Sequence, residues 1–308
     1  MKNKISFSQI LFLRISKIGS NFIDFFGLGN SFVLNLMTNI RIFLRRIINP
    51  TTLGQLEIYI AEHCNLSCFS CHHFSQLAVP EFADLAVTER DLKRFSELSG
   101  GYIPIINLSG GEPLLHPQLP DFMRIAREFF PDSKIKILTN GLLLLAQKDL
   151  FWEAVKKYNI AISPTKYPGI NWEKIEKNAN TYGCKLEYAG YTRKSKKMSR
   201  KYIIDLLGKQ NAIKSFKRCY MAANCTPLKN GRIATCHFVF SVQHFNNYFN
   251  QHIPVNESDS IDIYKVNDMK EIIEFVNKPI PLCAYCKSWG KQVVGDWREG
   301  EKLISDWT

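Results

Sequence analysis

The chain has 308 residues, of which 45% are hydrophobic and 12% aromatic, and its formal net charge is +12. This composition suits a sizeable core and excludes a disordered or low-complexity protein. Residues 1–50 and 191–201 each carry a net charge of +6, so the remaining chain is neutral. Because a general polyanion-binding protein would spread its basic residues more widely, we predict no nucleic-acid partner.

Residues 1–50 alternate short apolar runs with scattered basic residues. No uninterrupted apolar run reaches the ~20 residues needed to span a bilayer, so we predict one or two amphipathic helices. Two interpretations stay open. The helices either contact an anionic membrane surface or a partner protein, or they pack over the rest of the fold. Asn49-Pro50 marks a predicted domain boundary.

Three cysteines follow the first predicted strand, at residues 56–61: Cys64, Cys68 and Cys71. Three close thiolates cannot complete a tetrahedral zinc site or the four corners of an iron–sulfur cube. Such a set leaves one metal position open, as catalytic metal sites do. Because these thiolates already form the set, we expect packing or hydrogen-bonding roles for the neighbouring histidines: His63, His72 and His73.

Polar motifs end the next three predicted strands, at residues 103–108, 134–138 and 160–163. They are Gly110-Gly111-Glu112-Pro113, Thr139-Asn140-Gly141 and Ser163. Adjacent glycines let the backbone approach a ligand closely. Taken singly, the first two motifs would also suit ordinary turns. An ordinary turn would not explain why both motifs follow the cysteine triplet in this order.

Helical patterns alternate with these strands. They cover residues 88–98, 118–129, 148–158 and 171–182, and a fifth strand is predicted at 184–188. In the first helix, we expect Thr88 as the N-cap and Asp91 in the capping-box position. Repeated β–α units with right-handed crossovers predict an α/β fold, with a parallel sheet curled into an open, partial barrel.

The cysteine triplet, GGEP and TNG together resemble the radical S-adenosylmethionine (SAM) enzymes. The resemblance implies a partial barrel over residues 51–200 and a 4Fe–4S cluster on the three thiolates, with SAM on its open iron. The implied SAM contacts are Gly110, Gly111 and Glu112 near the methionyl amino group, Thr139 and Asn140 near the ribose or carboxylate, and Ser163 near the ribose. The chain departs from the family before the third cysteine, where Ser70 replaces the usual aromatic residue and Phe69 lies one place earlier.

Five further cysteines lie beyond residue 200, and four of them resemble a twitch/SPASM-like auxiliary cluster domain, predicted here over residues 201–308. The resemblance implies a second 4Fe–4S cluster on Cys219, Cys236, Cys283 and Cys286. Gly231 supplies the glycine of the family's G-x4-C pattern, and Cys225 lies too near it to fit. The sequence alone leaves open whether Cys219 or Cys225 is the ligand, and a structural zinc site would use four thiolates equally well.

The resemblance implies reductive cleavage of SAM to a 5′-deoxyadenosyl radical that abstracts a hydrogen atom from an unactivated C–H bond. His73-Phe74-Ser75 also resembles radical SAM proteins of surface-polysaccharide pathways. We therefore predict an oxidoreductase that acts on a carbohydrate or glycan precursor, with an electron donor such as flavodoxin or ferredoxin. The alternatives are a maturase that modifies a peptide, and a non-catalytic zinc-binding adaptor. The sequence does not assign an acid–base or radical-quenching residue.

The cysteine usage also indicates the compartment. An odd number of cysteines, arranged in close clusters without a cleavable signal sequence, favours reduced metal-binding thiols over disulfides. We therefore expect a cytoplasmic protein, either free or peripheral at the inner membrane face.

Overall fold

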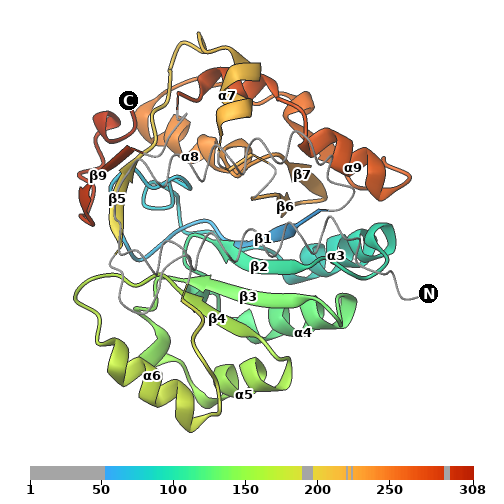
Figure 1. Cartoon of the computed structure of the whole chain (residues 1–308), viewed down its shortest axis with the longest axis vertical. Coiled ribbons are helices and arrows are strands. Elements are labelled where there is room, and N and C mark those ends of the chain that lie inside the picture. Colours follow the sequence, from blue (N-terminus) through green and yellow to red (C-terminus); the bar gives the residue numbers. More distant parts are fainter. Residues whose placement is uncertain (1–52, 189–196, 220, 223–224, 288–291) are drawn as a thin grey trace, which may run out of the picture. The chain divides into compact units, whose positions relative to one another are not determined.

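The computed structural model describes residues 53–188, 197–219, 221–222, 225–287 and 292–308 (Figure 1). The helices that we predict within residues 1–50, and residues 193–196 of the basic strip at 193–201, lie outside the described residues. Thr51–Thr308 form one compact unit. Among the described helices, none is long and apolar enough to cross a membrane.

A seven-stranded sheet organises this unit, in the order β4-β3-β2-β1-β6-β7-β8 (Figure 1). Its first four strands run parallel: β1 (Gln55–Ala61), β2 (Ile105–Gly110), β3 (Lys134–Thr139) and β4 (Ala161–Pro164). The predicted open parallel α/β sheet is thus confirmed. The strand predicted at 184–188 is wrong in extent, because only a single parallel bridge joins Leu186 to Ile162.

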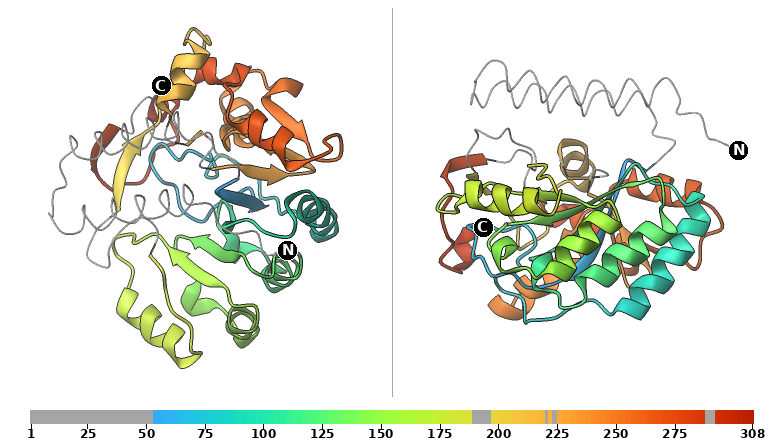
Figure 2. Two further views of the ribbon diagram at one scale, coloured as in Figure 1. Left: turned by 45° about the vertical axis from the view of Figure 1, so that its right-hand side comes forward. Right: turned by 90° about the horizontal axis from the view of Figure 1, so that it is seen from below.

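Three helices lie side by side along one face of the parallel strands (Figure 2): α3 (Leu85–Ser99), α4 (Leu119–Phe129) and α5 (Asp149–Lys157). A fourth, α6 (Trp172–Thr181), follows β4. Strand residues such as Ile58 and Ile106 and helix residues such as Phe95 and Phe122 belong to one fully buried cluster. Each such side chain stabilises the fold by about 1.5–3 kcal/mol.

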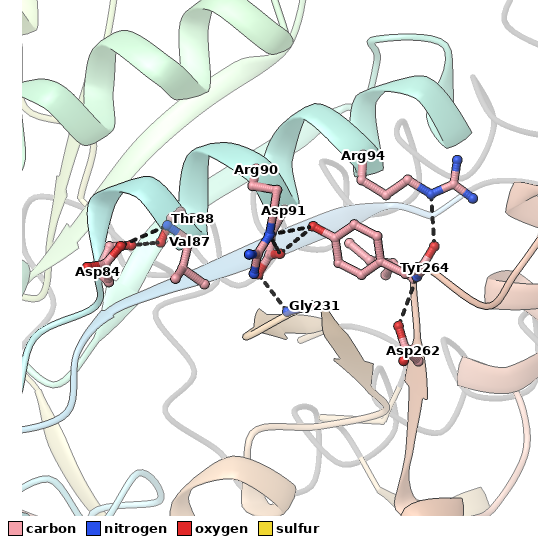
Figure 3. A network of polar contacts seen from close by, with 10 residues as sticks. Asp84, Val87, Thr88, Arg90, Asp91, Arg94, Gly231, Asp262 and Tyr264 are labelled. Atoms are coloured by element: carbon pink, nitrogen blue, oxygen red, sulfur yellow. Dashed lines mark hydrogen bonds and ion pairs between the residues drawn. The ribbon is translucent and has the colours of Figure 1, made fainter.

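Helix α3 begins three residues earlier than predicted. Its N-cap is Asp84 rather than Thr88, whose hydroxyl donates to the Asp84 carbonyl. Asp91 does not cap the helix. Its buried carboxylate accepts from Gly231 N over 2.6 Å and from the Tyr264 hydroxyl over 2.7 Å (Figure 3). The Thr88 prediction was wrong because the helix already begins at Asp84. The Asp91 prediction was wrong because its hydrogen-bond partners lie in segments distant in sequence.

The segment after residue 200 extends the same sheet. Strand β6 (Pro227–Lys229) pairs in parallel with β1 and leads through a tight turn into the antiparallel strand β7 (Arg232–Ala234). Strand β8 (Ser260–Asp262) comes later in the chain and pairs antiparallel with β7. The division into domains at 200/201 stays a prediction, since both parts contribute strands to one sheet. Strands β5 (Met198–Lys201) and β9 (Gln292–Asp296) form a separate antiparallel pair.

Helices α7 (Ala212–Arg218), α8 (Phe238–Phe249) and α9 (Met269–Val276) lie beyond β6 and β7 (Figure 1). A second buried cluster joins α8 to Phe74, Leu282 and Trp307. The 3₁₀ turns are η1 (Pro113–Leu115), η2 (Leu144–Ala146), η3 (Glu257–Asp259), η4 (Pro281–Tyr285) and η5 (Ile304–Asp306).

Candidate functional site

The loop with the first three cysteines leaves the C-terminal end of β1, and residues 297–307, the C-terminal strap, lie along it. Phe69 N donates to the Arg298 carbonyl over 3.1 Å, and Gly300 N donates to Ser67 O over 2.7 Å. The indole of the fully buried Trp307 donates to Cys71 O over 2.9 Å. The loop is therefore held from a part of the chain that sequence reasoning did not connect to it.

Several N–H groups point at the sulfur atoms of this loop. Leu66 N donates to Cys64 Sγ over 3.4 Å, and Trp297 Nε1 donates to Cys68 Sγ over 3.3 Å. Asn140 Nδ2 lies 3.6 Å from Cys64 Sγ. Donors of this kind stabilise thiolates and tune the iron–sulfur clusters that thiolates hold.

Burial and mutual repulsion raise the pKa of these thiols. Burial is the main cause for Cys64, and the charges of Cys71 and Cys68 add to it. Burial, followed by the Cys68 charge, raises the pKa of Cys71 to about 11. Metal binding releases the protons of such thiols and removes the repulsion. Three soft donors surrounded by N–H groups thus fit the predicted iron–sulfur cluster.

Gly110 and Gly111 lie where the end of β2 passes the cysteine loop. Gly111 N donates to Ala61 O over 2.7 Å, and Glu112 N donates to His63 O over 3.0 Å. A Cβ at Gly110 would collide with Ala61 O, and one at Gly111 would collide with His63 O. Close packing between two backbones therefore requires both glycines, whether or not a ligand is bound.

The Glu112 carboxylate ties the loop after β2 to the loop after β3. Oε1 accepts from Thr139 Oγ1 over 2.6 Å and from Leu114 N over 3.1 Å, while Oε2 accepts from Asn140 N over 2.8 Å. Burial raises the pKa of Glu112 to about 7, although these three hydrogen bonds oppose the shift. Glu112 and Thr139 are thus engaged with each other, which the sequence did not indicate.

The predicted SAM contacts are only partly brought together. Gly110, Gly111, Glu112, Thr139 and Asn140 surround the cysteine loop, and Asn140 Nδ2 donates to Asn65 Oδ1 over 2.7 Å. Ser163 is buried in β4, where it pairs with Leu138. It lies two strands away from β2. Its ribose contact stays a prediction, as do the others.

The residues before Cys71 have other partners. The Arg298 guanidinium lies 3.7 Å above the centre of the Phe69 ring. Ser70 has a left-handed backbone, with φ of 51°, and its Oγ accepts from Tyr202 N over 2.8 Å. The Phe69 face that Arg298 covers is therefore not open to adenine.

Four of the later cysteines gather near one another. Cys219 follows α7, Cys236 precedes α8, Cys283 lies in η4, and Cys286 follows η4 directly. Burial raises the pKa of Cys236, and the charges of the other three thiolates raise it further. Burial is also the main reason that the pKa of Cys283 rises to about 12. This is the set that we predicted for the auxiliary cluster, and its metal remains a prediction.

The two cysteines outside these groups lie elsewhere. Cys225 contacts other residues: its Sγ lies 3.9 Å from Gln55 Nε2, and its thiol hydrogen-bonds to Glu57. Cys184 is buried in the main core, as expected for a small apolar side chain.

Sequence reasoning missed a polar group on β1. Glu57 and Tyr59 are both buried, and alternation along a strand points their side chains to the same face of the sheet. Burial raises the pKa of Tyr59, and its further causes include the charges of Cys71 and Cys236. Tyr59 therefore lies within electrostatic range of both groups of thiols. A glutamate inside a buried strand was the available signal.

The comparisons with known proteins agree with this geometry. Residues 58–181 match the sequence model of the Radical SAM superfamily. The GTP 3′,8-cyclase of Chlorobaculum tepidum is 36% identical over 103 residues, which are 33% of this chain and 30% of that protein. The GTP 3′,8-cyclase of Microcystis aeruginosa is 32% identical over 120 residues, or 36% of this chain and 34% of that protein. The chain thus spans about a third of the length of these curated relatives.

Two solved structures are also similar. BtrN in complex with AdoMet and 2-DOIA has a TM-score of 0.48 at 15% identity, covering 77% of this chain and 94% of that one. Streptococcus suis SuiB bound to S-adenosylmethionine has a TM-score of 0.37 at 20% identity, covering 58% and 45%. The cysteine loop and both glycine motifs fall inside the region that the family model matches. Over residues 58–181, the chain is thus similar in sequence to the radical SAM superfamily.

Proposed function

We propose that the protein is a radical SAM enzyme that cleaves SAM reductively at a 4Fe–4S cluster on Cys64, Cys68 and Cys71. The observation that supports this most is the loop of three thiols at the C-terminal end of β1, with N–H donors directed at its sulfur atoms. When bound, the cluster and SAM supply one-electron chemistry that removes a hydrogen atom from an unactivated C–H bond.

The chain's own residues hold this site in place. Gly110 and Gly111 let β2 pack against the cysteine loop, and Glu112 fixes the two loops that end β2 and β3. Trp297 and Asn140 direct N–H groups at two of the sulfur atoms. Such preorganisation keeps a reacting carbon against one chosen hydrogen.

The second group of thiols suits an auxiliary 4Fe–4S cluster. Cys219, Cys236, Cys283 and Cys286 influence one another electrostatically, and all four are soft thiolate donors. A cluster here would accept the electron that a substrate radical gives up. The overall reaction would then be an oxidation, with an external electron donor such as flavodoxin or ferredoxin reducing the first cluster.

We propose a carbohydrate or glycan precursor as the substrate. The buried polar side chains of Glu57 and His237 suit a hydroxylated molecule better than an apolar one. The curated relatives are named for GTP, but they match only a third of their own length, so that substrate is not transferred. A peptide substrate is the alternative.

The test is anaerobic incubation with SAM and a strong reductant, followed by measurement of 5′-deoxyadenosine. Cys68→Ala should abolish the product. Cys283→Ala should retain uncoupled SAM cleavage and lose substrate oxidation, whereas Cys184→Ala should change neither. Purified protein should hold about eight iron atoms and matching sulfide. Protein that binds only zinc and makes no 5′-deoxyadenosine would instead support the adaptor.

Candidate substrates that carry deuterium would identify the substrate class by transferring the deuterium to 5′-deoxyadenosine. A sugar or nucleotide sugar that passes deuterium into 5′-deoxyadenosine would identify the class and the position attacked. Label transfer from a peptide alone would support the maturase and reject the carbohydrate.

A further inference from the structure

Three imidazoles lie together next to both groups of thiols. His72 and His73 directly follow Cys71 in the chain, and His237 directly follows Cys236. One potential ligand nitrogen from each ring lies within 4.8 Å of the other two. The ring centroids of His73 and His237 are 4.1 Å apart, and those of His72 and His237 are 5.0 Å apart. The fold thus brings His237 to two consecutive histidines that are distant from it in sequence.

The backbone orients His73. Its Nδ1 lies 2.5 Å from the Gly110 carbonyl, which can only accept a hydrogen bond. Nδ1 therefore carries the proton, and Nε2 keeps a free lone pair. Metal-binding histidines usually donate their other N–H to a carbonyl or carboxylate in this way, because the bond fixes the tautomer and the ring orientation.

The Glu57 carboxylate lies next to the His237 ring, as the Gly110 carbonyl lies next to His73. Nδ1 of His237 lies 3.1 Å from Glu57 Oε2, and both side chains are at least 95% buried. Within the described part of the chain, Nε2 of His237 has no hydrogen-bond partner. A buried imidazole nitrogen without a hydrogen-bond partner lowers the stability of the fold. A cation bound at Nε2 would remove that cost, and Glu57 would accept from Nδ1.

We propose that His72, His73 and His237 bind one divalent cation of borderline softness, such as Zn²⁺ or Fe²⁺, and that Glu57 positions His237. Imidazole donors suit these ions. Three protein ligands leave a fourth position for water or an oxygen atom of a substrate, as in catalytic zinc sites. This site goes beyond the proposed function, since cleavage of SAM does not require it.

The aromatic surroundings support a defined site. The Tyr202 ring packs against His72 at a centroid distance of 4.4 Å, and the Tyr59 ring packs against His73 at 5.5 Å. These contacts limit the rotation of both imidazoles. Rings held by packing and by hydrogen bonds form a more preorganised metal site than freely rotating surface histidines.

A competing set shares one ligand with the proposed site. Potential ligand atoms of Glu57, Cys225 and His237 also lie within 4.8 Å of one another. We favour the three imidazoles because Glu57 already accepts from Gln55 Nε2 over 3.3 Å and stands where a ligand histidine's carboxylate partner is usually found. Cys225→Ser separates the two sets, since it would leave the imidazole site intact and break the other.

The experiment uses the full chain with its iron–sulfur clusters loaded, equilibrated anaerobically with Zn²⁺ and then desalted. We expect about one retained zinc per chain, with no loss of iron. X-ray absorption at the zinc edge should show nitrogen and oxygen neighbours without sulfur. Sulfur neighbours, or no retained zinc in protein with a full iron content, would overturn the proposal.

Variants assign the ligands. His73→Gln and His237→Gln should each lower zinc affinity at least tenfold, and Glu57→Gln should lower it roughly 10- to 100-fold. His252→Gln, at an exposed histidine, and Cys225→Ser should bind zinc as the unaltered protein does. Iron content reports folding of each variant. If His237→Gln loses iron because it does not fold, two measurements still test the proposal. They are the zinc-edge absorption spectrum of the unaltered protein and the zinc affinity of Glu57→Gln.

The outcome is separable from that of the proposed function. Protein that makes 5′-deoxyadenosine but holds no nitrogen-bound zinc rejects the imidazole site alone. Protein that holds such zinc but makes no 5′-deoxyadenosine rejects the SAM chemistry alone.

Discussion

The indole Nε1 of Trp297 donates a hydrogen bond to Cys68 Sγ over 3.3 Å, although 229 positions separate the two residues. A donor to a cluster sulfur stabilises the more negative, reduced state of the cluster. We expect Trp297→Phe to make the midpoint potential of the first cluster more negative, as measured by redox titration with EPR. Trp152→Phe is the matched control, because the Trp152 N–H has no hydrogen-bond partner among the described residues. An unchanged potential in Trp297→Phe would count against this bond.

Adding one methyl group at Gly111 should disrupt the first cluster site. The new Cβ would collide with His63 O and push β2 away from the cysteine loop. We expect Gly111→Ala to lower the iron content toward that of Cys68→Ala, as measured by iron and sulfide analysis. Gly54→Ala is the control, since no described atom lies within 4 Å of a Cβ placed there. Normal iron content in Gly111→Ala would show that the backbone contact is dispensable.

Removing the Asp91 carboxylate should destabilise the fold without shortening α3. Asp91→Ala leaves Gly231 N and the Tyr264 hydroxyl without their acceptor. The expected loss in the free energy of unfolding is about 1–3 kcal/mol, which urea denaturation would measure. Glu97→Ala, at an exposed ion pair on the same helix, should change it by less than about 0.5 kcal/mol. Equal effects of the two variants would refute the role given to Asp91.

The raised pKa of Glu112 predicts a pH dependence of stability. Burial raises this pKa from 4.5 to about 7, so the folded protein holds a proton that the unfolded chain has released. The free energy of unfolding should therefore fall as pH rises from 4.5 to 7 and level off above 7, with a total change on the order of 3 kcal/mol. Urea denaturation between pH 5 and 8 would measure it. Parallel pH profiles for Glu112→Gln and the unaltered protein would contradict this assignment.

Local patterns predicted the parallel half of the fold well. The β-branched runs that became β1, β2, β3 and β4 carry their signal within six or seven consecutive residues, and so does the cysteine triplet. The position of Gly231 before Cys236 is also a local spacing, and the four later cysteines that it helped to select influence one another electrostatically. Their role as ligands stays a prediction. Their metal remains to be tested.

Features that depend on contacts between distant segments were not predicted. The Asp91 carboxylate meets Gly231 N across 140 positions, and no local pattern distinguishes this use of an aspartate from a helix cap. The same reason applies to Trp297 and Trp307, which contact the cysteine loop from beyond residue 290. The imidazole cluster escaped notice because His73 and His237 meet only after β1 and β6 have paired.

The strap has a consequence for biosynthesis. A ribosome completes Cys64, Cys68 and Cys71 more than two hundred residues before it adds Trp297 and Trp307, so the nascent loop emerges without the hydrogen-bond donors of the strap. Iron and sulfide delivered at that stage would meet an unsupported loop. We therefore expect premature termination directly before residue 297 to weaken iron retention at the first cysteine loop while leaving all four later cysteines in the chain.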